Sequence, residues 1–414
     1  MIKKNKINTN LILLLLGRMV SDTGTAIQMA VMPIYIIDIG GSAATVGLFS
    51  FLSFLPALLV YPFAGVMGDR WNRKAIMVST DLISGAVILL LALSAYSERL
   101  TLPLLLLAQV AISLLNGLFG PATKGIVPQL ADSENLSRAN SAVASLRTLS
   151  SMAGPVIGMT LYMSFGVRVL FIVNGSSFVL SSCSEMMIRY IHKKKTEQIN
   201  FFEELVDGFK FIFTQKTIYN LCFFLLVIYA LIQPLFTIVL PLFFRTALKY
   251  PDAQYGYLQM IIVAGAFLGS VLVGVLFGKE NKETKALSIG LLLLISTMLG
   301  FSALLFPNSL SLLGADTLLY FCIFSGALGL LSVSLMFINV PVQTIIQKKS
   351  SDKYMSRVFS VVGMITKGGL PFGGLIYGII LNRIEIYWTI SASTLLIILV
   401  SGVFHFAFRN RELS

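Results

Sequence analysis

The stretch that decides the fold reads GVMGDRWNRK and occupies residues 65–74. It closes one apolar run, at about 43–67, and precedes another, at about 75–96. Each run has the roughly 20 apolar residues that a helix needs to cross a lipid bilayer. The stretch is therefore predicted to be a short basic connection between two antiparallel membrane-spanning helices.

Composition extends this prediction to the whole chain. Its 414 residues are 56% hydrophobic and 12% charged, and its mean hydropathy is +0.85, whereas soluble domains carry about 25% charged residues. A soluble core of this length cannot enclose so much apolar surface, so lipid has to be the solvent for most of it. The apolar runs predict an all-α membrane protein with twelve transmembrane helices, at about 11–37, 43–67, 75–96, 101–120, 140–164, 168–190, 217–243, 255–278, 286–306, 315–338, 357–381 and 385–408.

The basic charge predicts topology. A formal net charge of +12 would suggest a nucleic-acid partner in a soluble protein. Most of the 31 Lys and Arg residues, however, lie in alternate connections and at both ends of the chain. The other connections hold Arg99, Arg168, Arg245, Lys249 and Arg383. By the positive-inside rule the basic side is cytoplasmic. We therefore expect no nucleic-acid partner, and a multi-pass protein of the bacterial cytoplasmic (plasma) membrane with both termini in the cytoplasm.

The longest polar stretch separates the runs into two sets of six. It covers residues 192–216, where apolar side chains recur at helical spacing opposite charged ones. Such a pattern is typical of an amphipathic helix in the headgroup layer. The predicted organisation is an N-terminal six-helix bundle at 1–191, a cytoplasmic linker at 192–216 and a C-terminal six-helix bundle at 217–414.

An internal repeat favours the same division. LSRANS at 136–141 precedes a run that contains GPVIG at 154–158, and MSRVFS at 355–360 precedes a run that contains LPFGG at 370–374. The Ser-Arg pairs and the proline–glycine kinks recur about half a chain apart. Duplicated halves around a site at the membrane midplane are how many secondary transporters are built.

The stretch at 65–74 resembles the signature cytoplasmic loop of the major facilitator superfamily, a glycine followed by D-R-x-G-R-[RK]. Asn72 stands where the family usually has glycine, and asparagine is the next most tolerant residue of a left-handed turn. The resemblance implies that Asp69 meets the N-terminal end of a later helix and locks the outward-facing state. The positions that match this gating loop are Gly65, Asp69, Arg70, Arg73 and Lys74.

Gly154, Pro155 and Gly158 resemble the antiporter motif of the superfamily's drug and metabolite exporters, with Met159 in place of a second glycine. Small residues let helices approach closely and proline bends a helix. An ordinary kinked packing helix is the alternative. The whole-chain pattern is similar to the macrolide-efflux and siderophore-export branch of the superfamily.

Charges inside the apolar runs are the best guide to energy coupling, since each costs at least a few kcal/mol unless it is paired or hydrated. Asp22 shares a polar face of the first run with Arg18, four residues earlier. Asp22 is the first candidate for the proton site, and a static Arg18–Asp22 pair that only orients the helix is the alternative.

Other embedded charges are weaker candidates. Lys367, deep in the eleventh run, either meets a carboxylate or an anionic substrate group or extends along the cavity. Asp81 and Arg147 lie about two turns from the cytoplasmic face, where pairing at a gate is the alternative to transport chemistry. Glu185 lies closer to the interface and is expected to be solvated.

Uncharged polar residues predict a wide apolar cavity with few directional contacts, which suits an amphipathic organic substrate. The chain has no phosphate-binding loop and no His/Cys cluster with metal-ligand spacing, so we expect neither an enzyme nor a metal site. The candidate cavity residues are Thr25, Gln28, Gln109, Ser113, Asn116, Tyr229 and Gln233.

The predicted function is proton-coupled efflux of an amphipathic small molecule, such as a macrolide-like drug, by alternating access. It would need no cofactor beyond the proton gradient, would act as a monomer, and would have its substrate, protons and the bilayer as partners. One alternative is export of an endogenous metabolite or lipid, such as a siderophore or lysophospholipid. Another is a membrane receptor or assembly factor that keeps the fold without transport.

Overall fold

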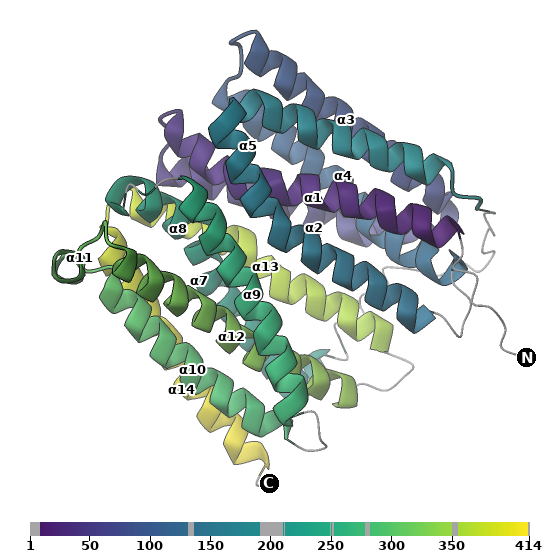
Figure 1. Ribbon diagram of the computed structural model, residues 1–414. Helices are drawn as coiled ribbons and strands as arrows, with labels where there is room; N and C mark the ends of the chain where they lie inside the picture. Colours follow the sequence, from purple (N-terminus) through teal and green to yellow (C-terminus); the bar gives the residue numbers. More distant parts are fainter. Residues whose placement is uncertain are drawn as a thin grey trace, which may run out of the picture. The chain divides into compact units, whose positions relative to one another are not determined.

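The computed structural model describes residues 9–130, 136–190, 210, 212–248, 250, 252–277, 282–349 and 355–412. These residues form helices, turns and no strand (Figure 1). The predicted linker at 192–216 lies mostly outside them. The elements are α1 (Thr9–Asp38), α2 (Ala43–Arg70), α3 (Arg73–Tyr96), α4 (Leu102–Leu130), α5 (Leu136–Met186), α7 (Lys216–Pro234), η2 (Leu235–Val239), α8 (Leu240–Phe243), η3 (Phe244–Leu248), α9 (Asp252–Phe277), α10 (Glu283–Leu304), α11 (Pro307–Leu313), α12 (Leu318–Lys349), α13 (Met355–Leu381) and α14 (Ile386–Glu412).

Helix α5 consists of two helices joined end to end. Gly166 separates them with φ 74° and ψ −178°, a conformation that glycine adopts because it lacks a Cβ. We call residues 136–165 the first half of α5 and residues 167–186 the second half. Ten stretches of described residues are long and apolar enough to cross a membrane, and one of them, Ser145–Met186, contains parts of both halves. Counting the two halves of α5 separately brings these to eleven, and α1, a helix of 30 residues, is long enough to be the twelfth. The predicted all-α membrane fold is confirmed.

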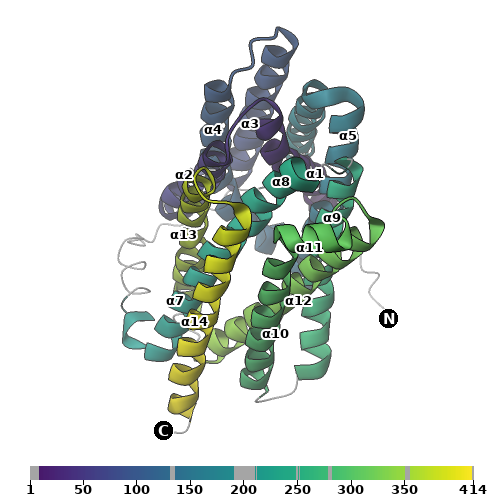
Figure 2. The same cartoon turned by 90° about the vertical axis from the view of Figure 1, so that its left-hand side faces the viewer.

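The chain divides into two compact units. Unit 1 consists of Met1–Tyr35 and Leu52–Phe201, and unit 2 of Ile36–Phe51 and Phe202–Ser414. In unit 1, α3 packs along α4 and α5. In unit 2, α12 packs along α9 and α10, and α13 packs along α7 (Figure 2). The end of α1 and the start of α2 therefore belong to unit 2.

Glycines set the distance between α1 and the first half of α5 in unit 1. A Cβ on Gly158 would lie 3.0 Å from the carbonyl oxygen of Ile27, and a Cβ on Gly154 would collide with the side chain of Ala26. In lipid, apolar surfaces gain little by leaving their solvent, so close packing and hydrogen bonds hold helices together. The two glycines of the GPVIG segment therefore allow α1 to dock against α5.

Unit 2 contains a similar contact. Gly369 and Gly373 of α13, also four residues apart, lie against Leu226 and Ala230 of α7. A Cβ on Gly373 would collide with the carbonyl oxygen of Ala230. The repeat in the sequence thus corresponds to a repeat in packing. In each unit, two glycines close to a proline contact the first helix of the predicted set of six, which is α1 in unit 1 and α7 in unit 2.

Replacing Gly154 with valine is expected to destabilise the protein by about 1–3 kcal/mol, because the new side chain overpacks the contact between α1 and α5. Gly326→Val in α12 is the matched control, since no neighbouring atom lies within 4 Å of where its Cβ would be. Thermal unfolding of the purified protein in detergent measures both variants. Equal melting temperatures for the two variants would contradict the packing role of Gly154.

Candidate functional site

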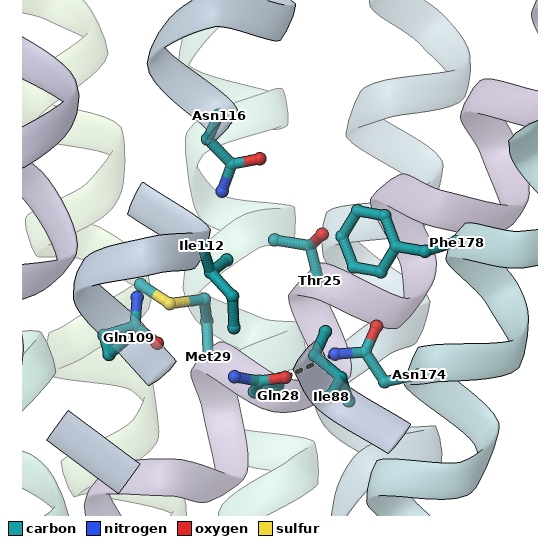
Figure 3. Close-up of a pocket in the computed structure, with 9 residues that line it drawn as sticks. All are labelled: Thr25, Gln28, Met29, Ile88, Gln109, Ile112, Asn116, Asn174 and Phe178. Carbon is teal, nitrogen blue, oxygen red and sulfur yellow. Dashed lines mark hydrogen bonds between the residues drawn. The ribbon is translucent and has the colours of Figure 1, made fainter. Parts of the chain in front are cut away.

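A small pocket with polar and apolar walls lies inside unit 1 (Figure 3). Its volume is about 20 Å³, enough for about one water molecule. Helices α1, α4 and the second half of α5 supply its polar groups, and Met29, Ile88, Ile112 and Phe178 supply the apolar part of its wall. The polar lining residues are Thr25, Gln28, Gln109, Asn116 and Asn174.

A buried pair of amides joins α1 to α5 at this pocket. Asn174 Nδ2 donates a hydrogen bond to Gln28 Oε1 (Figure 3), and the two side chains are 1% and 6% exposed. Gly24, one turn earlier on α1, makes room for this contact, because a Cβ there would collide with Asn174 Oδ1 and Ser177 Oγ. Gln109 is also buried, and its Oε1 accepts no hydrogen bond from the described residues. The pocket thus presents amide groups with some hydrogen-bonding capacity unused.

The structure brings together four of the predicted cavity residues, namely Thr25, Gln28, Gln109 and Asn116. It places Ser113 outside the pocket wall, against α2. The Ser113 hydroxyl donates to the carbonyl oxygen of Ser53 at 2.9 Å and accepts from the amide of Ala57 at 3.1 Å. Ser113 therefore serves as a link between α2 and α4.

Tyr229 and Gln233, the remaining predicted cavity residues, lie on α7 in unit 2. The Tyr229 hydroxyl donates to Asn339 Oδ1 at 2.7 Å; Tyr229 is partly buried and Asn339 is buried. Gln233 is also partly buried, and its carbonyl oxygen accepts from Thr237 Oγ1. Neither of these α7 side chains lines the pocket of unit 1.

Asn174 is the pocket residue that sequence reasoning missed, and a signal for it exists. Asn174, Ser177, Ser181 and Glu185 recur at intervals of three and four residues along the second half of α5. All four are buried. A polar face at helical spacing in an apolar run predicts contact with another polar face, and α1 provides it.

Arg18 and Asp22 form the ion pair that their spacing predicts. Arg18 Nη2 lies 3.0 Å from Asp22 Oδ2, and the side chains are 14% and 23% exposed. The guanidinium also lies over the ring of Phe119 from α4, at 4.9 Å from its centre, an arrangement that favours a cation. Asp22 is thus paired, and it is not the most deeply buried acid in its unit.

Glu185 is fully buried, so the expectation that it is solvated is wrong. The end of α5 is covered by the starts of α1 and α3. Asn10 exchanges two hydrogen bonds with the backbone of Arg189, and Lys74 Nζ donates to the carbonyl oxygen of Met186 at 2.7 Å. These contacts place the starts of α1 and α3 beside the end of α5, where Glu185 lies. We call this end of unit 1 the Asn72 end.

Asp81 is also buried, at 3% exposure. It interacts electrostatically with Arg18, Asp22 and Glu185. Arg147 is exposed. Asp81 thus faces other charged groups of unit 1, and a gate role for Asp81 or Arg147 stays a prediction.

Within the stretch at 65–74, residues up to Arg70 belong to α2 and residues from Arg73 belong to α3, so Trp71 and Asn72 connect the two helices. Asn72 has φ −66° and ψ 110° and caps α3, its Oδ1 accepting from the amide of Ala75 at 3.3 Å. The left-handed turn expected there is wrong, because an asparagine side chain in extended conformation satisfies a free N–H group at the helix start. Among the predicted gating residues, the structure describes Arg73 and Lys74 with their side chains. The side chains of Gly65, Asp69, Arg70 and also Lys367 lie outside its description.

A second set of contacts, within unit 2, joins residues 36–51 to α13 and η3. Arg245 Nη2 lies 2.7 Å from Asp38 Oδ2, and the amide of Ala44 donates to Asn382 Oδ1 at 3.3 Å. A Cβ on Gly47 would lie 2.7 Å from the carbonyl oxygen of Gly374. An ion pair and a close backbone contact therefore secure the end of α1 and the start of α2. Among the described residues, no group of three His, Cys, Asp or Glu side chains is arranged to hold a metal ion.

Comparison with known proteins agrees with this architecture. The pattern of the Major Facilitator Superfamily matches residues 14–374. Macrolide efflux protein A of Streptococcus pyogenes is 25% identical over 91% of this chain and 90% of its own length. The multidrug efflux pump Tap of Mycobacterium bovis is 23% identical over 67% of this chain and 69% of its own length.

Among solved structures, a bacterial homologue of the human lysosomal transporter Spinster superposes with a TM-score of 0.72. It is 14% identical in sequence, and the match covers 98% of this chain and 97% of that one. Three observations point to the same family. The described residues form the helices of a multi-pass membrane protein, a short connection joins α2 to α3 within the stretch at 65–74, and the family pattern matches most of the sequence. The chain belongs to the major facilitator superfamily and is a multi-pass membrane transporter, not an enzyme.

Proposed function

We propose that this protein is a proton-coupled secondary exporter of an amphipathic small molecule, of the macrolide-like drug class. It would act as a monomer in the bacterial cytoplasmic membrane with both termini in the cytoplasm. Similarity to a macrolide efflux protein and to a multidrug efflux pump supports export. The basic connections counted along the sequence support the orientation.

The observation that carries the proposal is the polar face of α1. Arg18 and Asp22 form an ion pair on this face, and Thr25 and Gln28 line the pocket one and two turns further along. Charged groups in a membrane-spanning helix are costly and mark ion or substrate pathways. A helix with a charged pair at one end of its polar face and amides at the other suits a transporter that links proton movement to substrate binding.

Alternating access needs contacts that close one side of the membrane and then separate. We assign this role to residues 36–51, which the Asp38–Arg245 pair and the Gly47–Gly374 contact hold within unit 2. In the proposed orientation these residues lie on the outer side. Opening of that side would require the ion pair to break, and the pair is only partly buried, with side chains 30% and 22% exposed.

Purified protein in liposomes is expected to accumulate radiolabelled erythromycin against its own gradient when a pH gradient is imposed. A protonophore should abolish the accumulation, since the proton gradient is the energy source. Liposomes without protein are the control. If the protein moves erythromycin equally well without a pH gradient, coupling to protons is excluded. If no compound in a panel of cationic, neutral and zwitterionic lipophiles moves, a receptor or assembly role is favoured.

Asp38→Asn is expected to favour opening of the outer side. A partly exposed ion pair contributes about 1 kcal/mol, so the open population should rise about fivefold. A cysteine at Ala44, in a variant whose three native cysteines have been replaced, should then react about fivefold faster with an impermeant maleimide. Exchanging the charges, with Asp38→Arg and Arg245→Asp together, should restore the slow rate. A cysteine at the exposed residue Ser97 is the control. Equal labelling rates at Ala44 with and without Asp38→Asn would contradict the gating role.

A further inference from the structure

Two buried carboxyl groups in unit 1 lie beside the Arg18–Asp22 pair. Asp81 lies eight residues into α3, about 12 Å along the helix at 1.5 Å per residue, and Glu185 is next to the last residue of α5. Asp81 interacts electrostatically with Arg18, Asp22 and Glu185. Three helices therefore bring three carboxyl groups and one guanidinium together toward the Asn72 end of the unit.

Neither of these carboxyl groups forms an ion pair within the part of the chain that the structure describes. Glu185 is 0% exposed and Asp81 is 3% exposed. Neither oxygen of Glu185 makes a hydrogen bond with the described residues, while the carboxyl group of Asp81 meets the side chain of Ser181 on α5. A buried carboxylate without partners costs several kcal/mol, whereas the neutral acid costs much less. A metal ion does not account for the cluster, since the described residues offer no metal-binding group of three.

The charges around the cluster do not balance when every acid is ionised. Arg18 Nη2 forms an ion pair with Asp22 at 3.0 Å, and the guanidinium group lies over the Phe119 ring. Lys74 lies at the edge of the unit and donates to a backbone carbonyl oxygen. From α4 the cluster is faced by Phe119, and the Lys124 side chain lies outside the description. With every acid ionised, the described cluster of Arg18, Asp22, Asp81 and Glu185 would therefore carry a net charge of −2.

We propose that Asp81 and Glu185 together form the site that binds the coupling protons, with Asp22 acting as the counter-ion of Arg18. This inference deepens the proposed function and rests on it for the role of the protons in transport. Each proton taken from solution converts one carboxylate of the pair into a neutral carboxylic acid, and its release restores the carboxylate. The two acids lie on different helices, so loss of both protons places like charges across the α3–α5 contact.

One continuous polar seam connects this site to the pocket. On α5 the seam runs through Glu185, Ser181, Ser177 and Asn174, which span about 16 Å of helix. Its partner on α1 includes Gly17, where a Cβ would lie 3.3 Å from both the carbonyl oxygen and Oγ of Ser181. At the other end Asn174 donates to Gln28 in the pocket. A change in charge at Glu185 therefore acts on the same helix pair that forms the pocket wall.

The test uses Glu185→Gln, which keeps the size of the protonated acid but cannot ionise. Its melting temperature should match that of the unchanged protein, because glutamine resembles the neutral form. In liposomes, accumulation of erythromycin driven by a pH gradient should fall about tenfold or more, whereas exchange of erythromycin without a gradient should persist. Asp81→Asn should behave in the same way. Glu98→Gln, an exposed acid at the other end of α3, is the matched control and should leave both activities unchanged.

A second measurement reads proton binding without transport. Infrared difference spectra of the purified protein between acidic and alkaline buffer should show the carbonyl band of a protonated carboxyl group. The band should weaken in Glu185→Gln and in Asp81→Asn, and persist in Asp22→Asn and Glu98→Gln. A band lost in Asp22→Asn but kept in both other cluster variants would overturn the assignment, as would undiminished pH-driven accumulation in Glu185→Gln. If the band behaves as expected and the unchanged protein moves no erythromycin, the proton site stands and the proposed substrate fails.

Discussion

The structure depends on the requirement that a polar helix face inside a membrane bundle must be covered by another polar face. Lipid supplies no hydrogen bonds, so amides and charges on α1 are stable only where a neighbouring helix or water meets them. The second half of α5 meets them in unit 1. Gly17 and Gly24 allow the approach, because a side chain at either position would press on Ser181, Ser177 or Asn174.

Helix α1 is also contacted on a second side, by the first half of α5. Contact with the second half alone would leave α1 free to rotate about its axis. Gly154 and Gly158 receive Ala26 and Ile27, while Thr23 Oγ1 donates to Ser150 Oγ at 3.0 Å. Helix α1 is therefore held between the two halves of one continuous element, with Gly166 as the break between them. This arrangement explains how a motif that resembles an antiporter signature and an acid near the end of the same element act on one helix. A movement of α1 relative to either half changes both the pocket and the charge cluster.

The fold could be predicted almost entirely from the sequence, because apolar runs of membrane-spanning length and their alternating basic connections follow directly from bilayer thickness and charge. The i, i+4 spacing of Arg18 and Asp22 predicted their ion pair. The polar face of α1 predicted that Thr25 and Gln28 line a cavity, and both line the pocket. Glu185 was misjudged because distance from a helix end says nothing about which neighbour covers it. Asn10 and Lys74, far away in sequence, bind the backbone at and just beyond the end of α5, close to Glu185.

The same limit applies to Ser113 and Asn72. Ser113 lies on the helix face predicted to line a cavity, yet two backbone groups of α2 occupy its hydroxyl. The left-handed turn expected at Asn72 came from the glycine usual at this position. The side-chain oxygen of Asn72 instead caps α3, which glycine cannot do because it has no side chain. In each case the decisive partner is a backbone group, and residue identities alone do not show which backbone groups are free.

In this protein, proton occupancy near Glu185 and binding of the drug are linked through the α1–α5 seam, which also forms part of the pocket wall. The most direct measurement follows the pH of a weakly buffered solution of the detergent-purified protein as erythromycin is added. The account predicts that protons are released in proportion to the drug bound, and that Glu185→Gln binds the drug with little release. Saturable binding to the unchanged protein with no release of protons over the pH range of the titration would contradict it.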